Sequence, residues 1–121
     1  MSIKMREILI ELNRNKGVLG SLITLKDGIP VEAVLSEGVD LATFSATISE
    51  VGQTISKSER LLGIGELQQA IIETSTSRLF IADVGFGYLA VIAQLDVNVG
   101  MIKLLVTEAQ KDIRNIRFEE G

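Results

Sequence analysis

The chain has 121 residues, 46% of them apolar, a net charge of −4, and neither His nor Cys. This length fits one domain, and the missing imidazole and thiol groups exclude a Cys/His zinc site, a His-based catalytic triad and disulfide bonds. The negative charge argues against a nucleic-acid partner, while the aliphatic surplus in so small a chain indicates a surface that a partner covers.

No segment has the pattern of an export signal or a membrane span. The apolar run from Ile8 to Ile10 is too short for the core of a signal peptide. The longest uncharged apolar stretch, from Val84 to Ala93, is half as long as the roughly twenty residues that a transmembrane helix needs. We therefore expect no membrane insertion and a cytoplasmic location.

The first third of the chain predicts a helix followed by a hairpin. Apolar residues recur at helical spacing at Met5, Ile8, Leu9 and Leu12. This helix is expected to end before Gly17. Two β-rich runs, 18–25 and 31–35, then flank the turn-forming pair Asp27-Gly28. Pro30 opens the second run, which predicts an edge strand because proline cannot donate a backbone hydrogen bond.

The segment 40–62 predicts the longest helix, with Asp40 as its N-cap and Gly63 as its stop. Its apolar residues follow one heptad seam: Leu41, Phe44, Ile48, Val51, Ile55 and Leu62. We expect this seam to face the sheet. A neighbouring stripe contains only small side chains: Ala42, Ser45, Ser49, Gly52 and Ser56.

Small residues in register allow another helix to come close, and a glycine inside a helix costs about 1 kcal/mol relative to alanine unless packing offsets it. We therefore expect the small stripe to pack on its own copy across a two-fold axis in a homodimer. The alternative is that the stripe is solvated or contacts a nearby loop. The third face of the helix is polar and is a candidate partner surface: Thr43, Thr47, Glu50 and Thr54.

Three further strands are predicted at 66–74, 78–84 and 88–95, and Asn98 is a plausible N-cap for a last amphipathic helix. The order α-β-β-α-β-β-β-α predicts an α+β fold in which three helices cover a five-stranded antiparallel sheet. We expect one domain, with a flexible tail at 116–121. The strand at 66–74 has no Lys or Pro to protect it, so Leu67 and Ile71 are expected at a strand-to-strand dimer contact.

No motif indicates catalysis. Gly85, Gly87 and Ala90 match a dinucleotide-binding fingerprint, but this fingerprint must open a helix, and the residues from Tyr88 onward predict a strand. A hairpin turn explains the two glycines better. Carboxylates such as Asp83 and Asp96 are not brought together by any spacing in the sequence. We expect no enzyme activity, no catalytic residues, no cofactor and no metal.

The pattern as a whole resembles the Roadblock family, small proteins related to a dynein light chain and to bacterial and archaeal partners of Ras-like GTPases. The resemblance spans about Met5 to Ile113. It rests on the element order and the Ser/Thr/Gly-rich central helix. It also rests on three local stretches: Gly17 to Leu25, the turn Asp27-Gly28-Ile29-Pro30, and Asn98-Val99-Gly100-Met101.

The resemblance implies a profilin-like sandwich whose central helix and third strand form a dimer with one continuous sheet. It also implies a partner, a small Ras-like GTPase that the dimer binds and regulates, for example as a GTPase-activating protein, or scaffolds. Two alternatives stay open: a scaffold subunit of a motor or signalling assembly, and a small-ligand sensor, both without GTPase contact.

Overall fold

The computed structural model describes residues 3–120, and the side chains of 4–116. The element order is the predicted one. The elements are α1 (Ile3–Asn13), β1 (Val18–Leu25), β2 (Pro30–Leu35), α2 (Leu41–Leu62), β3 (Gln69–Glu73), β4 (Ser77–Asp83), β5 (Gly87–Gln94) and α3 (Val99–Glu120).

The five strands form one antiparallel sheet in the order β2-β1-β5-β4-β3. This confirms the predicted α+β fold. It also confirms that Pro30 lies in an edge strand and that β3 forms the opposite edge. At the β2 edge, the Asn13 side chain of α1 donates a hydrogen bond to the Val34 carbonyl at 2.9 Å. The two edges therefore differ, because the α1 side chains that the structure describes bond to β2 and not to β3.

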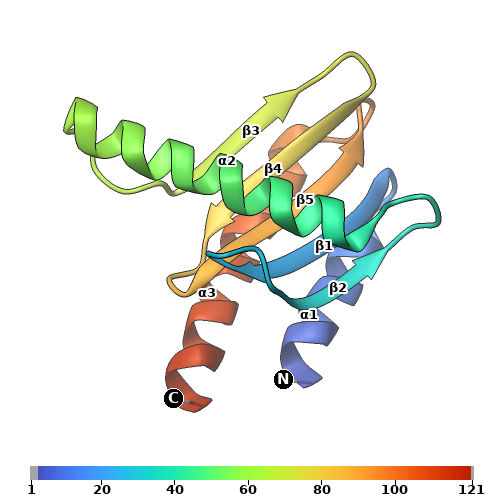
Figure 1. The fold of residues 1–121 in the computed structure, drawn as a ribbon. Coiled ribbons are helices and arrows are strands. Elements are labelled where there is room, and N and C mark those ends of the chain that lie inside the picture. Colours follow the sequence, from blue (N-terminus) through green and yellow to red (C-terminus); the bar gives the residue numbers. More distant parts are fainter. Residues whose placement is uncertain (1–2, 121) are drawn as a thin grey trace.

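The helices lie on both faces of the sheet (Figure 1). Helix α2 crosses one face, and α1 and α3 cover the other. Successive side chains of a strand point to opposite faces of the sheet, so each strand contributes to the cores on both faces. Phe80 packs toward α1 and α3, while its neighbour Ile81 packs toward α2. The larger core lies under α1 and α3, and the smaller one, beneath α2, contains Leu22, Ile48, Ile81, Tyr88 and Ala90.

The glycines between β4 and β5 form a hairpin turn, as predicted. Gly85 has φ +93°, and the Val84 N–H donates to the Gly87 carbonyl at 2.9 Å. A Cβ at Gly87 would lie 1.9 Å from the Thr24 carbonyl oxygen of the neighbouring strand. Both glycines are therefore needed for the turn and the strand contact, and the fingerprint does not open a helix.

Two boundary predictions need correction. Strand β3 begins at Gln69 instead of residue 66, because Gly63 and Gly65 have positive φ and carry the chain away from the helix before pairing starts. Leu67 consequently lies outside the strand. The tail predicted at 116–121 is instead helical up to Glu120, and Ile116 is buried in the core; Gly121 lies outside the described residues.

Candidate interaction surface

Helix α2 is fixed at both ends by its own sequence. The Thr43 N–H donates to Asp40 Oδ2 at 2.8 Å, and Gly63 adopts the left-handed conformation at the C-cap with φ +65°. Hydrogen bonds from the side chain and the backbone N–H of Thr43 hold the pKa of Asp40 below its ordinary value. The helix thus has an acidic N-cap that stays ionised at neutral pH.

The small-residue stripe of α2 faces the chain's own sheet in its central part. Ser45, Ser49 and Gly52 are buried, and a Cβ at Gly52 would lie 2.4 Å from Cζ of Tyr88. The Ser49 hydroxyl also donates to the carbonyl of Lys26. We expected these three residues to pack on the same helix of a second copy, but within one chain they already contact the sheet and the β1–β2 turn, because their small size lets α2 approach the sheet over the Tyr88 ring. Ala42 is exposed and Ser56 is half-buried.

The apolar seam faces the sheet only in the middle of the helix. Ile48 is fully buried, and Phe44 and Val51 pack against the smaller core. The prediction is wrong at both ends, where Leu41 and Leu62 are exposed. A 22-residue helix is about 33 Å long. It crosses the sheet obliquely, and its C-terminal end extends beyond the strands (Figure 1).

Exposed apolar side chains lie at this end of α2, in the segment after it, and on both faces of the β3 edge strand. Leu61, Leu62 and Ile64 are 76%, 69% and 70% exposed, and Ile71 and Ile72 of β3 are also exposed. We call these five residues the apolar end surface. Of these five residues, only Ile71 was predicted from the sequence to lie at a dimer contact. The seam has a seven-residue gap between Ile55 and Leu62, where Ser58 takes the intervening position, and this gap was a sequence signal for Leu62.

The predicted polar face of α2 is solvent-exposed. Thr43, Thr47, Glu50 and Thr54 are all exposed. Glu50 and Thr54 also line a shallow hollow of about 680 Å³ together with Lys26, Lys57 and Arg60. These are three of the four basic residues between positions 18 and 100. Lys26 was not predicted to lie beside this face, because it belongs to the β1–β2 turn and comes close to α2 only in the folded chain.

The described part of the chain shows no metal cluster: no three of its acidic side chains come together to hold an ion. None of its helices is long and apolar enough to cross a membrane. Two of the chain's carboxylates have structural contacts. Asp83 accepts a hydrogen bond from the Gly85 N–H and lies 3.7 Å from the Arg114 guanidinium, and Asp40 caps α2.

Residues 4–93 match the model of the Roadblock/LC7 domain. The chain belongs to this family. It is 30% identical over 107 residues to the protein MJ1340 of Methanocaldococcus jannaschii, covering 88% of this chain and 94% of that protein. Its fold is similar to that of Myxococcus xanthus MglB, with a TM-score of 0.90, 17% identity and 98% of each chain covered. A structure of MglB with a tetrameric arrangement gives a TM-score of 0.85 at 18% identity, covering 96% of this chain and 89% of that one.

Proposed function

We propose that the protein is a homodimeric, non-enzymatic Roadblock/LC7 module that binds a small Ras-like GTPase and regulates or scaffolds it. The apolar end surface carries the dimer part of this proposal. It places exposed aliphatic side chains beside a sheet edge that has no partner strand among the described residues. Such an edge is a template for pairing with another chain.

A two-fold axis beside β3 would join the two sheets and cover the exposed faces of this strand. Ile72 pairs with Leu79, which packs on the α2 side, whereas Ile71 pairs with Phe80 on the α3 side. The partner's β3 would take up the unpaired backbone groups. The overhanging end of α2, with Leu61 and Leu62, would lie against the second copy. Three other residues were predicted at the dimer interface. Leu67 and Ser56 are half-buried and lie within a few residues of the apolar end surface in the sequence. Ala42, near the opposite end of α2, is a weaker candidate for the dimer contact.

The polar face of α2 and the hollow beside it support the GTPase part of the proposal. The exposed threonines and Glu50 lie next to Lys26, Lys57 and Arg60, so this side of the dimer offers hydrogen-bonding groups and three cations. Members of the Roadblock family include partners of Ras-like GTPases. Arg78 is held by Glu73 and the Leu95 carbonyl, which makes it unsuited to insertion into a GTPase site. We expect regulation through the GTPase's own catalytic residues.

Sedimentation equilibrium tests the dimer. The wild type is expected to sediment as a dimer at micromolar concentration. Ile72→Lys, which introduces a charge at the unpaired edge, is expected to yield a folded monomer. Thr76→Lys, at the exposed β3–β4 turn, is the matched control and should stay dimeric. A monomeric wild type would contradict the dimer without bearing on GTPase binding.

Calorimetry tests the partner separately, with any small Ras-like GTPase encoded beside this protein, loaded with a GTP analogue or with GDP. Binding is expected to favour the GTP form and to weaken at least tenfold in Thr47→Lys, but not in Thr76→Lys. Absence of binding to either form, with the dimer intact, would favour a scaffold or a small-ligand sensor instead.

A further inference from the structure

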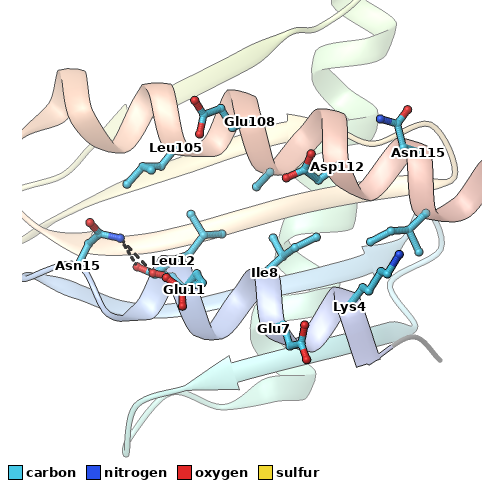
Figure 2. A pocket seen from close by; sticks show the side chains of 12 residues that line it. Lys4, Glu7, Ile8, Glu11, Leu12, Asn15, Leu105, Glu108, Asp112 and Asn115 are labelled. Atoms are coloured by element: carbon cyan, nitrogen blue, oxygen red, sulfur yellow. Dashed lines mark hydrogen bonds between the residues drawn. The ribbon is translucent and has the colours of Figure 1, made fainter.

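A groove runs between α1 and α3, on the face of the sheet opposite α2. The two helices lie antiparallel there, with Lys4 beside Asn115 at one end and Asn15 near Leu105 at the other (Figure 2). The groove has a volume of about 660 Å³. Its floor is apolar and consists of Ile8, Leu12, Leu105, Ala109 and Ile116.

The apolar floor is partly open to solvent. Ile8 and Leu105 are only partly buried where they pack on the larger core. On α3 the apolar stripe continues toward the helix start, because Met101 lies one turn before Leu105 and on the same side of the helix. Met101 is 52% exposed, and the adjacent Leu104 is 59% exposed. Exposed aliphatic surface in the groove is therefore concentrated at Ile8 and Leu105, and it continues along α3 to Met101 and Leu104, whereas the rest of the floor is buried.

Acidic side chains line both rims of the groove. Glu7 and Glu11 project from α1, and Glu108 and Asp112 project from α3 (Figure 2). Lys4 is the only basic residue in the lining, and Arg14 forms an ion pair with Glu11 outside it. Each rim places two carboxylates four residues apart on one helix, an arrangement that destabilises an isolated helix. Arg14 already offsets the charge of Glu11, so positive charge brought to the groove would chiefly relieve the repulsion between Glu108 and Asp112 on α3.

We propose that the groove binds a basic amphipathic helix of another protein. An apolar stripe with spacing i, i+3, i+4 and i+7 would lie on the floor, and flanking Lys or Arg residues would meet the two acidic rims. The α1 wall from Lys4 to Asn15 is about 17 Å long, which matches roughly three helical turns. Apolar contact supplies affinity and the charged rims supply orientation and selectivity.

A second copy of the same chain does not fit this groove. A two-fold contact would place the carboxylates of each copy against those of the other, since both partners would present the same surface. The same charge argues against nucleic acid and anionic lipid. The groove also lies on the other side of the sheet from α2, so its occupant can bind while the apolar end surface and the polar face of α2 are engaged (Figure 1).

A designed peptide provides the probe. It has three helical turns, Leu at i, i+3, i+4 and i+7, and Lys on both flanks; a second peptide has Glu in place of every Lys. Titrated into the nitrogen-15-labelled full chain, the Lys peptide is expected to shift the amide signals of Ile8, Leu12, Leu105 and Ala109. Shifts centred on α2, or no binding, would overturn the proposal. So would equal affinity for the Glu peptide.

The second experiment reverses a charge on the rim and measures the affinity for the Lys peptide by fluorescence anisotropy. Glu108→Lys is expected to weaken binding of the Lys peptide about tenfold, whereas Glu37→Lys, the same change at an exposed position outside the groove, should alter it less than twofold. Met101→Ser tests the apolar contact at an exposed site and should weaken binding severalfold. Circular dichroism melts check that each variant is folded. Equal affinity in Glu108→Lys and wild type, or self-association of the chain that Met101→Ser abolishes, would overturn the assignment to a basic helix.

Discussion

Gly52 of α2 lies directly on the aromatic ring of Tyr88 in β5, and a Cβ at this glycine would stand 2.4 to 2.6 Å from three ring carbons. Tyr88 is buried in the smaller core, where Leu22, Ile48, Ile81 and Ala90 surround it. The ring therefore has little room to move. This contact sets how closely α2 approaches the sheet.

Replacing Gly52 by alanine is expected to destabilise the protein. Helix propensity favours alanine by about 1 kcal/mol, but overpacking against a confined ring costs about 1–3 kcal/mol and, at this distance, more. We expect a net loss of about 2 kcal/mol, which corresponds to a fall in Tm of roughly 5–10 °C. Gly100→Ala in α3 is the control, because its Cβ would meet only Asn98 Oδ1 at 3.6 Å. A Gly52→Ala protein as stable as Gly100→Ala would refute the steric argument.

Ser49 and Gln53 both donate hydrogen bonds to the carbonyl of Lys26, which joins α2 to the β1–β2 turn. Ser49→Ala should cost about 1 kcal/mol of unfolding free energy, since one donor remains. The double variant with Gln53→Ala should lose more than the sum of the single changes, because the carbonyl then has neither side-chain donor. Urea denaturation of the four proteins measures this coupling, and strictly additive losses would argue against a shared acceptor.

Gln110 links α3 to the sheet and to the segment before β3. This buried side chain donates to the Asp83 carbonyl at 2.6 Å and to the Gln68 carbonyl at 3.2 Å. Gln110→Leu should lower the unfolding free energy by about 1–3 kcal/mol, because it leaves two carbonyls without this donor. Gln68→Leu changes an exposed side chain and keeps the carbonyl, so it should be close to neutral. Similar losses in both variants would contradict this role.

The N-cap of α2 predicts a pH dependence. Because hydrogen bonds from Thr43 lower the pKa of Asp40 in the folded chain, its ionised form contributes stability above the pKa of the unfolded chain. That contribution is lost as the pH falls through the folded-state pKa. Asn is an equally good N-cap without charge, so Asp40→Asn should be less sensitive over this acidic range. Urea unfolding of both proteins from pH 7 to pH 3 tests this, and parallel pH profiles would rule out the ionised cap.

The order of the elements and their hairpins could be predicted because most boundaries carry a local signal. Asp40 and Gly63 define α2, Asp27-Gly28 and Gly85 define two hairpins, and Pro30 marks the β2 edge. The inner face of α2 could not be predicted in the same way. Serine and glycine suit either a second helix or a ring beneath the helix, and only the fold brings Tyr88 under Gly52.

The candidate surfaces could be predicted to different degrees, because some depend on local spacing and others on contacts that only the fold creates. The polar face of α2 follows from helical spacing alone, so its four residues are exposed as expected. Leu62 belongs to the apolar seam, which predicts burial, but it and the adjacent Leu61 are exposed because the helix extends beyond the sheet. The groove joins α1 to α3, which are far apart in sequence, so no spacing within either helix indicates it.

The difference between the two sheet edges bears on how far an assembly can grow. At the β2 edge Pro30 lacks a backbone N–H, and Asn13 already occupies the Val34 carbonyl. If copies join at β3, each chain has used its one open edge, and the outward strands of the pair are both β2. Further strand addition then has no template. The protein would form a closed, finite particle of two chains instead of a filament.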